Sequence, residues 1–245
     1  DVFILDECSM IDISLFNAFL SALPLEAVLV MVGDIDQLPS VGPGCVLLDL
    51  ISSNEIPVTR LKEIFRQEKS SDIVTSAHAV NQGSWFPSNV GQDFFFIPSK
   101  KSENLQSTLR RLLLERIPQK FDFNPILDVQ ILAPMYRGES GIDRFNELLQ
   151  DWLNPDQDDL TAYGRSFRVG DRVMQLNNDY EKEVFNGDQG IVDRIDFNNG
   201  GIEVRFEEGR RVVYKKKELV DLTLSYCTSI HKVQGSEFPC VIVIL

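Results

Sequence analysis

Two acidic residues, Asp6 and Glu7, directly follow a short apolar run, Val2–Leu5. A carboxylate at the end of a buried strand can hold Mg²⁺ against the phosphates of a nucleotide. A second carboxylate beside it can orient and deprotonate an attacking water molecule. Taken alone, the pair could also be an exposed acidic turn without any chemistry. Whether Asp6 is a metal ligand and Glu7 a base must therefore be judged from the other motifs in the sequence.

A second polar segment, Gly33–Gly44, follows the next apolar run, residues 27–32. It is rich in Gly, Pro and Asp, which by itself indicates only a turn. Gln37 within it has a side chain suited to sensing a γ-phosphate or a polarised water. In parallel sheets, ligands bind beyond the carboxyl ends of the strands, and both polar segments fall there.

The elements that must position these residues follow from the apolar spacing. Residues 2–5 and 27–32 are continuous apolar runs, which predicts strands buried on both faces. Between them, apolar side chains recur at helical spacing over residues 12–23, and Pro24 ends the run. This strand–helix–strand order predicts a parallel sheet with right-handed crossovers.

The remaining chain changes its pattern at about residue 167. Before that point we expect helical structure from after Gln67 to about Asn81, strands at 93–97 and 128–133, and helices at 103–117 and 140–153. After it, apolar residues alternate with a period of two over residues 172–176, 189–196, 201–206 and 210–214, separated by Gly and Asn turns. Such short strands predict a small antiparallel barrel of about 55 residues inserted into an α/β domain.

The net charge of −13 argues against a broadly basic surface for nucleic acid, although a groove can differ from the average. A cluster at Arg210–Arg211 and Lys215–Lys217 is either a strand-binding patch or a solvated strand face. The four cysteines contain no C-x-x-C pair and predict reduced thiols in a cytoplasmic protein. No apolar run approaches the roughly 20 residues that cross a bilayer, so no membrane partner is expected.

Several segments in order resemble the motifs of RecD-type superfamily 1 DNA helicases. Asp6–Met10 is similar to motif II, the Walker B site, and Gly33–Gly44 to motif III. Leu61–Gln67 resembles motif IV, and residues 130–141 resemble the stretch between motifs IV and V. Residues 170–175 and 186–190 look like the SH3-like barrel of this family. Thr228–Phe238 resembles motif V, with Val233 where the family more often has Ser.

The resemblance implies an α/β fold of P-loop NTPase-like, RecA-type motor lobes with an inserted SH3-like β-barrel. We expect the end of the first, truncated lobe at residues 1–60 and the nearly complete second lobe at 61–166 and 223–245. The barrel would occupy residues 167–222. Aromatic residues of the barrel such as Tyr180, Phe185 and Tyr214 would either stack on bases or fill its core.

The resemblance also implies ATP and Mg²⁺ as cofactors and single-stranded DNA as a partner, in a 5′–3′ helicase of recombination or repair. Asp6 would hold Mg²⁺, Glu7 would activate water, and Gln37 would couple the γ-phosphate to the DNA face. Arg66 would stabilise charge on the transferred phosphoryl group, and Gly235 and Glu237 would belong to the nucleotide cleft. The expected DNA contacts are Thr228, His231, Lys232 and Gln234.

No G-x-x-x-x-G-K-[ST] loop occurs in the sequence. In the family this loop precedes motif II, so the resemblance implies that it lies upstream of Asp1 and that the arginine-bearing motif VI lies beyond Leu245. Strand patterns at both ends and a first residue other than Met also lead us to expect that both ends are cuts. The isolated chain is therefore predicted to hydrolyse ATP negligibly. The alternative is a non-catalytic DNA-binding or assembly subunit of a helicase–nuclease complex. A nuclease is disfavoured, because no set of convergent carboxylates accompanies the Asp6–Glu7 pair.

Overall fold

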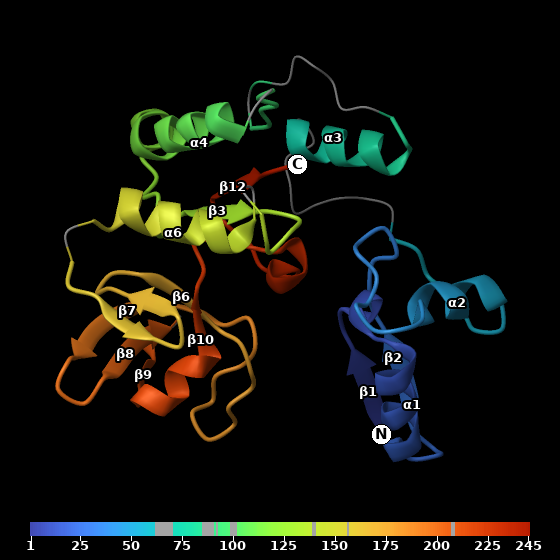
Figure 1. Cartoon of the computed structure of the whole chain (residues 1–245). Coiled ribbons are helices and arrows are strands. Elements are labelled where there is room, and N and C mark those ends of the chain that lie inside the picture. Colours follow the sequence, from blue (N-terminus) through green and yellow to red (C-terminus); the bar gives the residue numbers. More distant parts are fainter. Residues whose placement is uncertain are drawn as a thin grey trace. The chain divides into compact units, whose positions relative to one another are not determined.

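The computed structural model describes residues 1–61, 71–84, 91, 93–98, 102–138, 141–155, 157–206 and 209–245. They form two compact units, Asp1–Pro98 and Ser99–Leu245 (Figure 1). The predicted division into four parts is finer than these two units and stays a prediction. Within the described residues, no helix has the length and apolar composition that crossing a membrane requires.

The first unit contains a parallel pair of strands, β1 (Val2–Leu5) and β2 (Val28–Met31), as predicted. Helix α1 (Ile13–Ala22) connects them and begins at Asp12, whose carboxylate accepts a hydrogen bond from the backbone N–H of Leu15 at 2.8 Å. Helices α2 (Val46–Ser53) and α3 (Asp72–Asn81) follow. The strand–helix–strand order places the residues after β1 and β2 at the same edge of the sheet.

Two expectations for this unit were wrong. The strands are not buried on both faces, since Val2, Ile4 and Val28 are 66%, 69% and 57% exposed and no described element covers that face. Residues 93–97 form no strand. Asp93 instead accepts hydrogen bonds from Ser71 Oγ (2.6 Å) and the backbone N–H of Asp72 (2.9 Å), which tie this segment to the start of α3.

The second unit contains a parallel sheet in the order β11–β3–β12. Its strands are Cys227–Thr228, Val129–Leu132 and Cys240–Val243, and β3 in the centre is fully buried. Helix α6 (Ile142–Leu153) packs beside it through Phe145 and Leu149, both with no exposed surface. The predicted helix at 103–117 is α4 (Ser102–Arg111), a π-helical turn (Leu112–Arg116) and α5 (Ile117–Phe121).

The period-two region forms an antiparallel sheet of five strands in the order β10–β6–β7–β8–β9. The four predicted strands are β6 (Arg172–Gln175), β7 (Gln189–Asp196), β8 (Gly201–Phe206) and β9 (Arg211–Tyr214). The fifth, β10 (Leu222–Leu224), extends past the predicted end of the barrel at residue 222. Its pairing with β6 leaves β10 and β9 at opposite edges, so the described strands form an open sheet and not a closed barrel. A hairpin of β4 (Leu160–Ala162) and β5 (Arg165–Phe167) precedes this sheet.

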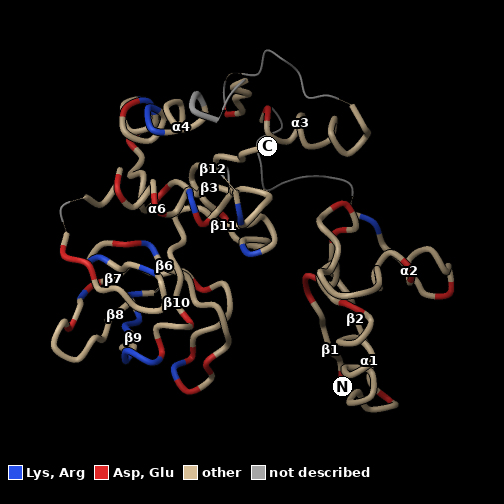
Figure 2. The backbone as a smooth tube through the Cα atoms, viewed as in Figure 1, with Lys and Arg blue, Asp and Glu red and all other residues tan. Residues whose placement is uncertain are grey.

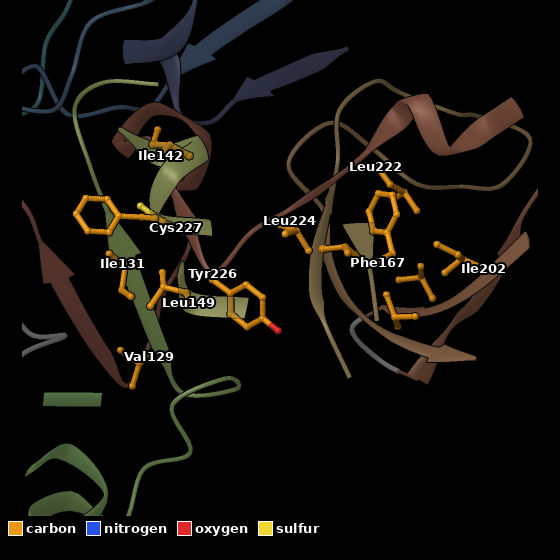
Figure 3. Close-up of a cluster of buried hydrophobic side chains, with 14 of the residues drawn as sticks. Val129, Ile131, Ile142, Leu149, Phe167, Ile202, Leu222, Leu224, Tyr226 and Cys227 are labelled. Atoms are coloured by element: carbon orange, nitrogen blue, oxygen red, sulfur yellow. The ribbon is translucent and has the colours of Figure 1, made fainter. Parts of the chain in front are cut away.

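One hydrophobic core joins the two sheets of the second unit (Figure 3). Val129, Ile131 and Leu149 lie on the parallel side of this core, and Phe167, Ile202 and Leu222 on the antiparallel side. Leu224, the last residue of β10, and Tyr226, just before β11, lie between the two groups. The antiparallel sheet is therefore packed against the parallel sheet as part of one core.

Candidate nucleotide and nucleic-acid sites

The acidic pair lies at the carboxyl end of β1, as predicted. Asp6 Oδ1 accepts a hydrogen bond from the backbone N–H of Glu7 at 2.8 Å, and both side chains are exposed. Glu7 has a φ of 53°, a left-handed conformation that costs a non-glycine residue about 1–3 kcal/mol. The next residue returns to the sheet, since the backbone N–H of Cys8 donates to Val32 O at 2.9 Å. The sharp turn therefore projects Asp6 and Glu7 outward from an anchored backbone.

The segment Gly33–Gly44 folds onto the residues that follow this pair. A Cβ on Gly33 would lie 3.0 Å from the backbone nitrogen of Cys8 and 3.1 Å from that of Ser9. A Cβ on Gly42 would lie 2.1 Å from Asp12 Oδ2. The backbone N–H of Ile13 donates to Pro43 O at 2.9 Å. The two segments that resemble motifs II and III thus touch through their backbones, and glycine at both positions permits the contact.

Gln37 lies in a turn after β2, where its side chain is exposed. Its backbone N–H donates to Asp34 O at 3.3 Å, and Asp34 Oδ1 accepts from the backbone N–H of Asp36 at 2.9 Å. This short polar turn follows the carboxyl end of β2, which lies beside the end of β1 that carries Asp6 and Glu7. The prediction for Arg66 cannot be placed beside them, because Arg66 lies outside the described residues.

The carboxylate oxygens at this site fit a Mg²⁺ ion whose other ligands are phosphate oxygens and water. Asp6 Oδ2 has no hydrogen-bond partner among the described residues. In that part of the chain, no three Asp, Glu, His or Cys side chains form a complete metal cage. Mg²⁺ is commonly held by one or two carboxylates, with phosphate and water oxygens as its other ligands. A single carboxylate at Asp6 matches that arrangement.

In the second unit, the residues predicted to contact DNA lie on β11, on the turn that follows it and directly after that turn. The turn is a 3₁₀ turn, Ile230–Val233, fixed by Val233, which packs on Leu132 and Met174. His231 is exposed and Lys232 is half-buried, whereas the side chain of Thr228 is only 5% exposed. Gln234 is half-buried and Gly235 and Glu237 are exposed beyond the turn. Thr228 therefore lies beneath the turn, while His231 and Lys232 lie at its surface.

Lys232 is hydrogen-bonded through Nζ to Asn186 Oδ1, on the loop between β6 and β7. The backbone N–H of Asn186 donates to Asn178 Oδ1 at 2.9 Å, which fixes this partner. No carboxylate among the described residues forms an ion pair with Lys232, and burial lowers the pKa of its ammonium group. Asn186 was predicted only as part of an Asn–Gly turn, because a contact across 46 residues has no local sequence signal.

The two arginines of the basic cluster are ion-paired. Arg211 pairs with Asp193 at 3.2 Å, and Arg210 pairs with Asp188 at 3.4 Å. Lys and Arg are interspersed with Asp and Glu along β7 and β8 (Figure 2). Both arginines therefore behave as parts of a solvated, ion-paired sheet face, in contrast to Lys232.

The aromatic residues of the antiparallel sheet separate into two kinds. Tyr214 is 1% exposed, and its hydroxyl donates to Gln175 Oε1 at 2.8 Å, so it belongs to the core. Tyr180 and Phe185 are exposed and meet edge to face with ring centres 5.9 Å apart.

A buried carboxylate connects the antiparallel sheet to the rest of the second unit. Asp171 has no exposed surface and accepts hydrogen bonds from Gln150 Nε2 (2.6 Å), Asn154 Nδ2 (2.8 Å), Arg168 N (2.7 Å) and the Tyr226 hydroxyl (2.9 Å). Burial raises the pKa of Asp171, and these hydrogen bonds oppose the rise. The donors come from α6, from the loop before β6 and from the segment before β11. This network therefore fixes where the antiparallel sheet sits on the parallel one.

Family models match two parts of the chain. Residues 1–86 match an AAA domain, and residues 145–206 match the ATP-dependent RecD-like DNA helicase SH3 domain. The second match begins within α6 and ends with β8.

The similar proteins extend over the whole chain. The ATP-dependent RecD2 DNA helicase of Deinococcus radiodurans is 32% identical over 100% of this chain and 32% of its own length. The RecBCD enzyme subunit RecD of Mycolicibacterium smegmatis is 28% identical over 100% of this chain and 45% of its own length. The chain thus spans about a third to a half of these relatives.

Solved structures share the fold at lower identity. The Pif1 helicase from Bacteroides, in complex with ADP-AlF3 and single-stranded DNA, has a TM-score of 0.60 at 19% identity. That match covers 99% of this chain and 64% of the other. The Pif1 helicase from Candida albicans has a TM-score of 0.56 at 20% identity, covering 99% and 66%.

Proposed function

Since this chain is a relative of the RecD-type superfamily 1 DNA helicases, we propose that it forms part of an ATP-dependent motor on single-stranded DNA. The motor moves in the 5′ to 3′ direction and acts in DNA recombination or repair in the cytoplasm. The observation that carries the proposal is the contact of Gly33–Gly44 with the residues following Asp6 and Glu7. This contact joins the segment that would sense the γ-phosphate to the segment that carries the proposed base for ATP hydrolysis.

Four residues of the first unit have distinct roles in the proposed chemistry. Asp6 supplies one carboxylate to Mg²⁺, which neutralises phosphate charge when bound. Glu7 orients the attacking water and accepts its proton. Gln37 contacts the γ-phosphate and transmits its loss through Gly33–Gly44 to the backbone of Cys8 and Ser9. Arg66 stabilises charge on the transferred phosphoryl group.

Lys232 supports the DNA part of the proposal. It is a cation without a carboxylate partner in the described part of a chain whose net charge is −13. Its ammonium is held by a neutral amide, which orients the charge without cancelling it. A phosphate of a nucleic acid supplies the missing negative charge.

The test is ATP hydrolysis by the natural protein that contains this sequence, with and without single-stranded DNA. Glu7→Gln keeps the shape of the side chain but removes the base, and we expect it to lower kcat by about 100-fold or more. Glu26→Gln, at an exposed position of the same unit, is the matched control. DNA-stimulated hydrolysis that survives in Glu7→Gln contradicts the proposed role of Glu7.

The 245-residue chain on its own is a separate test. It has no G-x-x-x-x-G-K-[ST] loop to surround the β- and γ-phosphates. We expect no ATP hydrolysis above the Glu7→Gln background from this polypeptide. Turnover that disappears in Glu7→Gln would contradict this expectation.

A second candidate function is a non-catalytic subunit of a helicase–nuclease assembly. One relative is named as a subunit of the RecBCD enzyme, and the face of β1 and β2 exposes Val2, Ile4 and Val28 to solvent. Such a subunit would bind DNA without hydrolysing ATP. DNA binding by the natural protein with no DNA-stimulated hydrolysis would favour this function over the motor.

A further inference from the structure

Residues Met135 and Tyr136, which follow β3, are hydrogen-bonded to the start of α6. The backbone N–H groups of Ile142 and Asp143, in the first turn of α6, donate to the carbonyl oxygens of Met135 (2.9 Å) and Tyr136 (3.2 Å). A Cβ on Gly141 would lie 2.5 Å from Tyr136 O, so only glycine fits there. The backbone of Met135 and Tyr136 is therefore held by the helix and not left to solvent.

The segment after β3 presents Tyr136 to solvent. Tyr136 is 52% exposed, while its hydroxyl lies 3.3 Å from Ser229 Oγ, within hydrogen-bond distance. Ser229 is 8% exposed and immediately precedes the turn that carries His231 and Lys232. Tyr136 is thus anchored at its polar end by the predicted DNA-binding turn, and half of its surface remains open.

The position of Tyr136 and the residues around it indicate what its ring binds. Tyr136 and Ser229 lie beyond the carboxyl ends of two adjacent parallel strands, β3 and β11, where ligands of such sheets bind. Arg137 beside it is exposed. Tyr180 and Phe185 are also exposed, but Asp179, Glu181 and Glu183 lie next to them in the sequence and Lys182 is paired with Glu218. The carboxylates beside these two rings disfavour a phosphate backbone there.

We propose that Tyr136 stacks on a base of the single-stranded DNA whose phosphate is held by Lys232. The contact is to the face of a nucleobase and is therefore tolerant of sequence. A ring already fixed at its hydroxyl loses little side-chain freedom on stacking. This inference rests on the proposed DNA-binding function and adds to it a residue that contacts a base rather than a phosphate.

The experiment compares two fluorescent oligonucleotides of equal length, oligo(dT) and a fully abasic strand, bound by the natural protein. Tyr136→Ala should weaken binding of oligo(dT) by about tenfold and leave the abasic strand unchanged. Tyr136→Phe should keep most of the oligo(dT) affinity, because the ring remains. Tyr163→Ala is the matched control, since Tyr163 is 58% exposed and its hydroxyl also has a partner, Lys217 O at 3.4 Å. It should change neither affinity.

A second measurement keeps the test independent of folding defects. In Tyr136→Trp, oligo(dT) should quench tryptophan fluorescence beyond the change in the unmodified protein, and the abasic strand should not. Equal losses on both strands in Tyr136→Ala, or unchanged oligo(dT) affinity in it, would overturn the stacking role while leaving the DNA-binding function in place. No binding of either strand by the unmodified protein would overturn both.

Discussion

Asn186 Oδ1 accepts a hydrogen bond from Lys232 Nζ, so a loop of the antiparallel sheet holds a lysine that follows β11 of the parallel sheet. A Cβ on Gly187, the next residue, would lie 3.5 Å from Lys232 O, so the backbones of loop and turn are also close. An amide at this position orients the ammonium, whereas a carboxylate would neutralise it. The choice of Asn over Asp thus decides whether Lys232 remains available to an anion.

Asn186→Asp should weaken binding of single-stranded DNA by about tenfold, because an ion pair with Lys232 competes with the phosphate. The slope of log affinity against log salt should become shallower by about 0.7, the value for one single-strand phosphate contact. Asn186→Ala should weaken binding less, since it frees the lysine without neutralising it. Asn198→Asp, at an exposed turn between β7 and β8, adds the same charge elsewhere as a control. Equal effects of Asp at positions 186 and 198 would assign the loss to net charge alone.

Gly33→Ala should separate the two segments at the nucleotide site. The added Cβ would lie 2.8 Å from Leu47 Cδ2 and 3.0 Å from the backbone nitrogen of Cys8. Overpacking of this kind costs about 1–3 kcal/mol. We expect a lower midpoint in urea unfolding and reduced ATP hydrolysis by the natural protein. Gly91→Ala, where a Cβ meets nothing within 4 Å, should change neither, and an equally silent Gly33→Ala would refute the packing argument.

Asp159→Asn should lower stability in a pH-dependent manner. The hydrogen bond from Arg168 Nε, 2.6 Å long, is the main cause that lowers the pKa of Asp159 below its ordinary 3.8. A lowered pKa in the folded state stabilises the protein at pH values above 3.8, and this contribution disappears as pH falls through the folded value. The variant should therefore be less stable at pH 7 by about 0.5 kcal/mol, a small figure because the pair is partly exposed.

Thermal unfolding between pH 7 and pH 3 measures this difference. The gap between the unmodified chain and Asp159→Asn should close towards pH 3. Asp158→Asn is the charge-matched control for the neighbouring position. A gap that stays constant with pH would show that the Asp159 carboxylate contributes through something other than its charge.

Asp171→Asn should destabilise the second unit more strongly. The Asp171 carboxylate accepts four hydrogen bonds, and an amide NH₂ group in its place would face donors instead. Unpaired buried donors cost about 1–3 kcal/mol each. Tyr226→Phe removes one of the four donors and should cost about 1 kcal/mol. In urea unfolding, Asp171→Asn should have a lower free energy of unfolding than Tyr226→Phe. The reverse order would mean that Asp171 is not the centre of the network.

The elements that local pattern determines were predicted well. The buried strand β3, the helical structure over residues 103–117, and the alternation along β7 and β8 agree with the structure. Each depends on the period of apolar residues within a dozen positions. The Asp6–Glu7 turn was also placed correctly, since a parallel strand must end at the ligand edge of its sheet.

The failures involve information that lies far away in the chain. Residues 93–97 are apolar enough for a strand, but Asp93 is bound to the start of α3 instead of a sheet. The strand β10 was missed because three residues carry no period, and only its pairing with β6 defines it. The partners of Lys232 and Tyr136 are 46 and 93 residues distant, so no spacing rule could indicate them.

Only Ser225 and Tyr226 separate β10 from β11, although these strands belong to different sheets. Both residues are buried, and Tyr226 donates to Asp171. The antiparallel sheet is therefore not a detachable accessory of the parallel one. Removing it, or replacing it with the sheet of a relative, would displace β11, which positions the turn that carries Lys232. We expect a chimera that carries the antiparallel sheet of a relative to keep the proposed DNA affinity only when residues 222–228 are exchanged together with their partners on β3 and α6.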